Sequence, residues 1–135
     1  MDSSALEPIK TDSAPPPVGP YSQAVLVENW LYCSGQIALD PLTGEMIGNG
    51  NIEKETRQVL KNLMAVVEAA GGNESNVIRT TIYLTDLNDF AKVNQIYSET
   101  FESEVSPARA CVEVSNLPKG GKVEIDCIAW VGKTK

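Results

Sequence analysis

Residues 107–126, PARACVEVSNLPKGGKVEID, place one arginine and one glutamate on two strand-like segments that flank a single loop. From residue 108 to 114, small or apolar side chains alternate with Arg109, Cys111 and Glu113. A period of two is typical of a strand with one apolar face. We therefore predict that residues 108–114 form a strand and that Arg109 points away from the core.

The second strand-like segment shows the same alternation. Its apolar positions are Val123, Ile125, Cys127, Ala129 and Val131. Glu124 and Asp126 fall between these positions, so we predict that both carboxylates lie on the non-core face. Arg109 and Glu124 can then meet on one side of a sheet, which suggests an anion clamp beside an acid/base group.

The two segments can pair antiparallel. Matching their apolar faces then sets the register, because a slip of one residue would turn every side chain over. In that register Arg109 lies across from Asp126 or Ile128. The loop 115–121 is long for a hairpin, so an intervening strand is the alternative.

Two interpretations of Arg109 stay open at this point. It could pair with a nearby carboxylate such as Glu124 or Asp126 on a solvated face, an arrangement that is common and weak. However, Ile128 and Trp130 continue the same face as large apolar residues. A mixed face of this kind is more typical of a protein interface than of open surface, and it indicates an oligomer.

Composition and charge favour a compact domain with small-molecule chemistry. The chain has 135 residues, of which 42% are hydrophobic, and its 11 basic and 18 acidic residues give a net charge of -7. Such a surface repels nucleic acid and acidic lipid. We expect no membrane span, because no run of about 18 apolar residues occurs, and the polar, proline-rich start does not resemble a secretory signal.

The cysteine and histidine content limits the chemistry available. Cys33, Cys111 and Cys127 form an odd, widely spaced set in strand-like runs, which suits reduced thiols and a cytosolic setting. Histidine is absent, which removes the commonest general base and a usual metal ligand. Catalysis would have to use carboxylates, arginine, tyrosine, serine, cysteine, backbone groups or water.

The residue pattern predicts an α+β domain, with one mixed sheet backed by two helices on a single face. Strands are predicted at 21–27, 30–34, 77–84, 108–114 and 123–131, and helices at 51–70 and 88–102. We expect Gly71-Gly72 to end the first helix and Asp86 or Asn88 to cap the second. Residues 1–18 are expected to form a flexible tail, and residues 19–135 a single domain.

Two further residues allow more than one interpretation. Asn94 lies at the edge of the apolar stripe of the second helix, and a buried amide must find partners; the simpler view is a bond to nearby backbone. Cys111 lies near Arg109, whose charge could lower the pKa of a thiol. Its position in an alternating strand favours a small hydrophobic residue instead.

Several stretches together resemble the RidA family of reactive intermediate deaminases, also called the YjgF or translation-inhibitor family. They are GPYSQA at 19–24, CSGQI at 33–37, TGE at 43–45, TTIYLTDLNDFAKVN at 80–94 and the stretch 107–126. The resemblance implies a chorismate-mutase-like subunit in a homotrimeric barrel, with a pocket at each subunit interface. It also implies hydrolysis of 2-imino acids or their enamine tautomers to 2-oxo acids and ammonia, without cofactor or metal. Removal of these reactive compounds would protect pyridoxal-phosphate enzymes.

The resemblance assigns roles to individual residues. Arg109 would grip the substrate carboxylate with its planar fork, and Glu124 would position or activate the attacking water. Residues matching positions that line the family's pocket are Tyr21, Ser34, Gly35, Phe90, Asn94 and Cys111. The expected partners are copies of the same chain and small 2-imino acids, in the cytoplasm, with no nucleic acid or membrane. Two alternatives are an RNA-cleaving translation inhibitor and a holdase-like trimer without chemistry.

Overall fold

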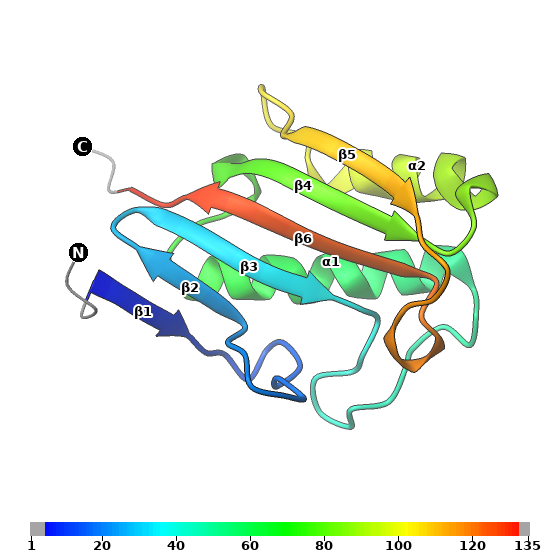
Figure 1. Ribbon diagram of the computed structural model, residues 1–135. Coiled ribbons are helices and arrows are strands. Elements are labelled where there is room, and N and C mark those ends of the chain that lie inside the picture. Colours follow the sequence, from blue (N-terminus) through cyan, green and yellow to red (C-terminus); the bar gives the residue numbers. More distant parts are fainter. Residues whose placement is uncertain (1–4, 133–135) are drawn as a thin grey trace.

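The computed structural model describes residues 5–132 and contains a six-stranded mixed sheet with two helices packed on one side (Figure 1). The strands are β1 (Leu6–Ile9), β2 (Ala24–Val27), β3 (Trp30–Gln36), β4 (Val77–Leu84), β5 (Ala108–Glu113) and β6 (Val123–Trp130). The helices are α1 (Ile52–Ala69) and α2 (Phe90–Thr100). The predicted α+β class, with two helices on one face of a mixed sheet, is confirmed.

The strands lie in the order β1-β2-β3-β6-β4-β5. All neighbours are antiparallel except β4 and β5, which are parallel. A parallel pair needs a crossover connection, and α2 provides it by packing against the side of the sheet that α1 also covers (Figure 1). In the described part of the chain, neither helix is long and apolar enough to cross a membrane.

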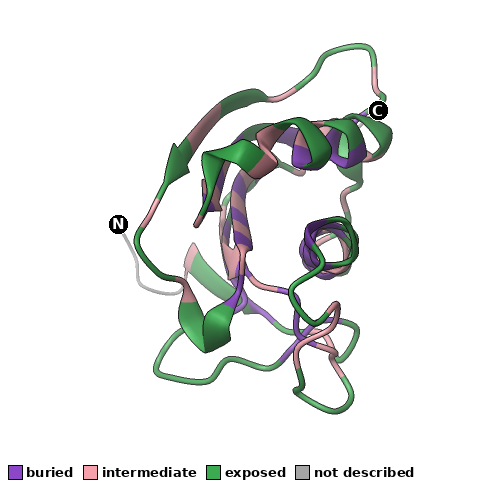
Figure 2. Cartoon of the chain, turned by 90° about the vertical axis from the view of Figure 1, so that its right-hand side faces the viewer, coloured by how far each residue is buried: buried purple, intermediate pink, exposed green. Residues whose placement is uncertain are grey.

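The core lies between the helices and the sheet, where the buried segments of the chain are purple in Figure 2. We call this covered side of the sheet the helix face and the other side the open face. Fully buried residues of this core are Leu31, Ile82 and Ile125 on the helix face of the sheet and Val59, Leu63 and Val66 on α1. The open face keeps large apolar side chains partly exposed, from 40% for Trp130 and 42% for Val112 to 49% for Tyr32. Helices therefore cover only one of the two faces of the sheet.

The ends of α1 follow from its sequence. Asn51 caps its start by accepting a hydrogen bond from the Lys54 N–H at 3.0 Å. After the helix, Gly71 adopts a φ of +92°, and its N–H donates to the Glu68 carbonyl. A left-handed residue of this kind is a common helix stop that glycine adopts without steric cost, so the predicted end of the first helix is confirmed.

The start of the second helix differs in detail from the prediction. Asp86 caps a short 3₁₀ turn, Leu87–Asp89, by accepting from the Asn88 N–H, and α2 follows at Phe90. Asn88 is therefore inside the turn rather than a cap. The short turn aims α2 back across the edge of the sheet, where it meets β5 (Figure 1).

The pairing proposed for the two strand-like segments is wrong. β4 lies between β5 and β6, and it pairs parallel with one and antiparallel with the other. The alternative of an intervening strand is therefore correct. The long loop after β5 carries the chain past the end of β4, so the two segments that share the loop are not neighbours in the sheet.

The predicted orientation of Arg109 is also wrong. Arg109 is opposite Thr80 and Cys111 is opposite Ile82 in the parallel β4–β5 pair. Thr80 and Ile82 are fully buried on the helix face, and directly paired residues share a face. Arg109 and Cys111 therefore face the helices. The error arose because β5 is an edge strand with small residues in both sets of alternate positions, so its pattern does not identify the core side.

The amino-terminal segment differs from the flexible tail expected over residues 1–18. Leu6–Ile9 form β1, which pairs antiparallel with β2, and both Ile9 and Ala14 are buried. The following turn is held by Gln23, whose side chain bonds Thr11 and the carbonyl groups of residues 14 and 15. Residues 1–4, which belong to the same expectation, lie outside the described residues.

Candidate active site

The candidate site residues form two groups that the sheet separates. Tyr21, Ser34, Gly35 and Glu124 line one groove, which we call the Glu124 groove. Phe90, Asn94, Arg109 and Cys111 gather where α2 packs against β5, which we call the Arg109 edge. The prediction that Arg109 and Glu124 meet on one side of the sheet is wrong for a single chain, because Arg109 is on the helix face and Glu124 on the open face.

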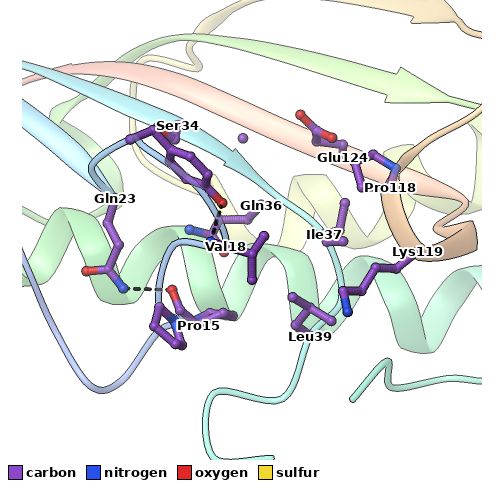
Figure 3. A pocket seen from close by; sticks show the side chains of 13 residues that line it. Pro15, Val18, Gln23, Ser34, Gln36, Ile37, Leu39, Pro118, Lys119 and Glu124 are labelled. Carbon is purple, nitrogen blue, oxygen red and sulfur yellow. Dashed lines mark hydrogen bonds between the residues drawn. The ribbon is translucent and has the colours of Figure 1, made fainter. Parts of the chain in front are cut away.

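The Glu124 groove has a volume of about 430 Å³ and is mostly lined by apolar groups (Figure 3). One wall comes from the amino-terminal segment, through Pro15 and Val18, and another from Ile37 just after β3. The loop before β6 adds Pro118 and Lys119. The groove therefore offers a carboxylate within a small apolar recess.

A β-bulge in β3 shapes the floor of this groove. Cys33 pairs with Cys127 and Gln36 with Ile125, so β3 has two residues where β6 has one. Those two residues are Ser34 and Gly35. Bulges of this kind occur next to active sites because they redirect side chains and interrupt regular pairing.

Gly35 allows Glu124 to lie against the backbone of β3. A Cβ added at Gly35 would collide with Oε2 of Glu124. The absence of a side chain is thus what makes room for the carboxylate. Ser34 is occupied differently, because its hydroxyl donates to the Ser22 carbonyl at 2.7 Å. Ser34 therefore serves the local structure of the groove and is not set up as a nucleophile.

The environment of Glu124 favours its protonated form. Burial raises the pKa of this half-buried carboxyl, and the charge of Asp126 raises it further. Asp126 lies two residues along β6 on the same open face, and Oδ2 of Asp126 accepts a hydrogen bond of 3.1 Å from the Tyr83 hydroxyl. A carboxyl with a raised pKa in a groove is a candidate for proton transfer.

At the Arg109 edge, α2 fixes the arginine. Nη1 of Arg109 donates to Oδ1 of Asn94 at 2.7 Å. Its Cζ lies 5.4 Å from the Phe90 ring centroid and 4.9 Å from that of Tyr97, within cation–π range. Phe90, Asn94 and Tyr97 are spaced by four and three residues, so one stripe of α2 holds the guanidinium. Its other N–H donors have no side-chain acceptor among residues 5–132.

The hypothesis of a surface ion pair for Arg109 is not supported. Within residues 5–132, the one side-chain ion pair joins Arg57 to Glu99 at 3.0 Å. Asn94 is bonded to Arg109 rather than to nearby backbone, so the simpler view of this asparagine is also wrong. Arg109 thus has no carboxylate partner among residues 5–132.

The cysteines behave as small buried residues. Burial raises the pKa of the half-buried Cys111 thiol, and the charge of Arg109 opposes that effect. The Cys127 thiol also has a raised pKa, because of its hydrogen bond to Cys33 and its burial. The hydrophobic interpretation of Cys111 is therefore favoured over a reactive thiolate. In the described part of the chain, no three side chains of the metal-ligating types come together as a possible metal site.

Sequence reasoning missed several residues of the groove. Gln23 is buried, and its amide donates to three backbone carbonyl groups of residues 11, 14 and 15. It thereby fixes the segment that carries Pro15 and Val18 into the wall. The proline run just before residue 19 was the sequence signal for this wall, because prolines stiffen an extended chain. The surface on which this segment packs is visible only in the fold.

The chain matches known proteins along most of its length. The family model described as endoribonuclease L-PSP matches residues 11–131. A RutC family protein of Synechocystis is 53% identical over 121 residues, which cover 90% of this chain and 93% of that protein. The human protein named 2-iminobutanoate/2-iminopropanoate deaminase is 46% identical over 132 residues, which cover 98% of this chain and 95% of that protein.

The solved structures agree with these matches. The crystal structure of a protein of the Rid family from Yersinia pestis superimposes with a TM-score of 0.91 at 49% identity, covering 94% of this chain and 100% of that one. The chain therefore belongs to the Rid family, which the family model describes as endoribonuclease L-PSP. The resemblance inferred from the sequence is confirmed.

Proposed function

We propose that this protein hydrolyses reactive 2-imino acids, such as 2-iminobutanoate and 2-iminopropanoate, to 2-oxo acids and ammonia. The pair Arg109 and Glu124 carries the proposal. A guanidinium with no ion pair among the described residues suits the substrate carboxylate, and a carboxyl of raised pKa suits proton transfer at the C=N group. The human relative named for this activity supports it. Removing these imines protects pyridoxal-phosphate enzymes from damage, which completes the proposed role.

Arg109 binds the substrate carboxylate in this proposal. A guanidinium presents parallel N–H groups that match a carboxylate in a bidentate way, which a lysine ammonium cannot reproduce. Asn94 occupies only Nη1, so other donors stay available. Phe90 and Tyr97 restrict the guanidinium through their ring faces, which lowers the conformational entropy that binding would otherwise cost.

Glu124 handles water and protons. The oxygen of a water molecule adds to the C=N carbon of the protonated imine, while a proton of that water passes to the Glu124 carboxylate. This addition gives a carbinolamine. Glu124 returns its proton to the carbinolamine nitrogen, and the C–N bond breaks as the C=O bond of the 2-oxo acid forms. The hydroxyl proton passes to the Glu124 carboxylate, which then gives it to the departing ammonia. No electrons are gained or lost overall. A carboxyl with a raised pKa suits both directions of transfer.

We further propose that the working site forms between copies of the chain in a homotrimer. Arg109 and Glu124 lie on opposite faces of one sheet, so a second copy has to supply one of them. Exposed apolar residues on the open face, Trp30, Tyr32, Val112 and Trp130, support such a contact. An interface that joins two different surfaces closes into a ring when its rotation permits.

The proposed location is the cytoplasm. The three cysteines are free, and unpaired thiols are typical of reducing compartments. The proposed partners are other copies of the chain and small 2-imino acids.

The decisive experiment follows release of 2-oxobutanoate from 2-iminobutanoate that an amino-acid oxidase generates in the same solution. We expect the wild type to accelerate release and Arg109→Ala to lose that acceleration. Arg57→Ala is the matched control, because it removes one exposed arginine that pairs with Glu99 on the helical side. An unchanged rate in Arg109→Ala would contradict the assignment.

The description of the matching family model names a second activity, endoribonuclease. The net charge of -7 disfavours phosphate-backbone binding. Purified wild type and Arg109→Ala should both lack RNase activity beyond that of a mock preparation. RNase activity that disappears only in Arg109→Ala would favour RNA cleavage at this site instead. A holdase-like trimer without chemistry would be favoured if Glu124→Ala preserved cell protection and trimer-breaking changes removed it.

A further inference from the structure

A second carboxylate lies on the open face of β6, and the proposed reaction does not account for it. Asp126 is half-buried and lies two residues after Glu124, so the two side chains project from the same face of one strand. Within residues 5–132, neither carboxylate has a basic partner. Two unneutralised carboxylates this close in the middle of a sheet need an explanation.

Tyr83 lies beside both carboxylates. In the β4–β6 pair, Tyr83 is directly opposite Glu124, while Thr81 is opposite Asp126. The Tyr83 hydroxyl nevertheless reaches diagonally to Oδ2 of Asp126, at 3.1 Å. On the other side of β6, the bulge of Ser34 and Gly35 lies opposite Asp126. Asp126 is therefore held between a tyrosine from β4 and the irregular segment of β3 that forms the floor of the Glu124 groove.

We propose that Tyr83 and Asp126 are positioning residues of the deaminase reaction, which act on it by controlling the proton on Glu124. This inference rests on the proposed function and adds two residues to it. Neither residue touches the substrate in this account. Their effect reaches the reacting atoms only through the carboxyl of Glu124.

The physical basis is the interaction of like charges. The Tyr83 hydroxyl donates to Oδ2 of Asp126 and thereby fixes this carboxylate beside Glu124. A charged Asp126 then disfavours a second negative charge on Glu124. In agreement, burial is the largest cause of the raised pKa of Glu124, and the charge of Asp126 adds to it. The pKa of Tyr83 is itself raised, by burial and then by Asp126, so its hydroxyl stays a donor.

Other titratable groups lie near Glu124 or further along the same face. Lys119 and Tyr21 line the same groove, and Arg79 is opposite Ile128 further along the open face. The cations among them form no ion pair with Glu124 within the described residues. In the shared site, Arg109 of a second copy would also approach and favour the ionised form of Glu124. Asp126 offsets that effect and keeps Glu124 able to carry a proton.

The chemical advantage follows from the two-way transfer that imine hydrolysis needs. Glu124 has to accept a proton from water and then donate one to the leaving nitrogen. A carboxyl with the ordinary pKa of glutamate is a weak base near neutrality, and one with a higher pKa performs better. Two neighbouring carboxyl groups in different environments are a known way to give the two groups different pKa values.

The test combines a titration with a pH–rate profile. The carboxyl of Glu124 is followed by ¹³C NMR in labelled protein, and its signal is assigned by its loss in Glu124→Gln. In Asp126→Asn we expect the Glu124 midpoint and the acid limb of kcat/KM for 2-iminobutanoate to move together to lower pH. The plateau should fall by roughly two- to tenfold, because a weaker base transfers protons less well.

Two variants serve as comparisons. Tyr83→Phe keeps both carboxylates and loses only the bond to Asp126, so we expect a smaller shift in the same direction. Glu68→Gln removes one exposed carboxylate from the outer side of α1, and it should leave both the midpoint and the acid limb in place. Asp126→Ser provides a second neutral replacement, and circular dichroism selects the variants that fold.

The outcomes separate this inference from the proposed function. A Glu124 midpoint that does not move in Asp126→Asn and Asp126→Ser would overturn the inference, even if the rate falls, because a structural role would lower the rate without moving the titration. Absence of imine hydrolysis in the wild type would instead overturn the proposed function. The titration needs no substrate, so it still decides whether Asp126 acts on Glu124.

Discussion

The Glu124 groove and the Arg109 edge carry side chains of opposite charge, and the surroundings of these two side chains differ. Glu124 is half-buried near the middle of the sheet, where burial and a neighbouring carboxylate raise its pKa. Arg109 is exposed on an edge strand, and an amide and two aromatic rings hold it without neutralising it. The groove thus holds a carboxyl group with a raised pKa, and the edge holds a permanent cation.

The difference suggests that the Glu124 groove and the Arg109 edge each need a partner from outside their own chain. An arginine already paired with a carboxylate would bind a second carboxylate poorly, and Arg109 has no such pair in the part of the chain that the structure describes. A glutamate beside its own arginine would have a lowered pKa and lose basicity, and the sheet keeps Glu124 away from Arg109. In the proposed shared site, this separation within one chain would preserve both properties until a second copy and the substrate bring Arg109 and Glu124 together.

The largest expected effect is on the reaction rate, and it distinguishes the proposed roles of the Glu124 groove and the Arg109 edge. Glu124→Gln should lower kcat by about 10²–10⁴, the usual contribution of a positioned acid/base group, with little change in KM. Arg109→Ala should raise KM as well, because it removes carboxylate binding. Steady-state kinetics on 2-iminobutanoate measure both. A Glu124→Gln variant with wild-type kcat would show that the groove contributes no chemistry.

The second effect tests the close approach of Glu124 to the bulge. In Gly35→Ala the new methyl group collides with Oε2 of Glu124, so the carboxylate has to move. A displacement of about 1 Å can cost on the order of 10²-fold in rate, and we expect a loss of ten- to a hundredfold. Gly121→Ala is the control, since its added Cβ meets its nearest atoms at 3.4 Å or more. Equal activities in the two variants would contradict the geometry.

A smaller effect is expected at the Arg109 edge. Asn94→Ala removes the one side-chain hydrogen bond of Arg109 seen in residues 5–132 but leaves the two rings in place. We expect KM to rise by roughly three- to tenfold and kcat to change little. Gln95→Ala, at the exposed neighbouring position of α2, should behave as wild type. A fall in kcat without any rise in KM would place Asn94 in the chemistry rather than in substrate binding.

The smallest effect concerns stability. Because the pKa of Glu124 is raised in the folded state, folding favours its protonated form. That contribution is complete below the ordinary pKa of glutamate and is lost as the pH rises through the raised pKa. Glu124→Gln should therefore raise the melting temperature by about 1–3 °C near neutral pH and leave it unchanged in acid. A lower melting temperature at neutral pH would show that the groove stabilises the charged carboxylate.

Sequence patterns predicted those elements whose two faces differ clearly. In β6, Val123 and Ile125 are fully buried while Glu124 is not, so its alternation identified the correct face. β5 failed because Ala110 and Cys111 are both small and both partly buried at a sheet edge. The pattern of one strand also says nothing about its neighbours, which is why the alternation in β5 and β6 could not place β4 between them.

The candidate site was predictable only in part for a related reason. The chemistry of an arginine and a glutamate could be inferred from their types, and the family resemblance named the remaining candidates. Asn94 and Arg109 lie fifteen residues apart on a helix and a strand, and their contact exists only after α2 packs on β5. Asp126 has the same alternation as Glu124, so only the bond from Tyr83 distinguishes it.

The most direct test of the shared site mixes two variant chains, each of which lacks one of the two site residues. Arg109→Ala and Glu124→Gln chains, each inactive alone, are unfolded together and refolded, and mixed oligomers are verified by native mass spectrometry. If one copy supplies Arg109 and the next supplies Glu124, random mixing should restore about a quarter of the sites, because each intact site needs two specific neighbours. Mixed oligomers that stay as inactive as the parent variants would contradict a site shared between copies.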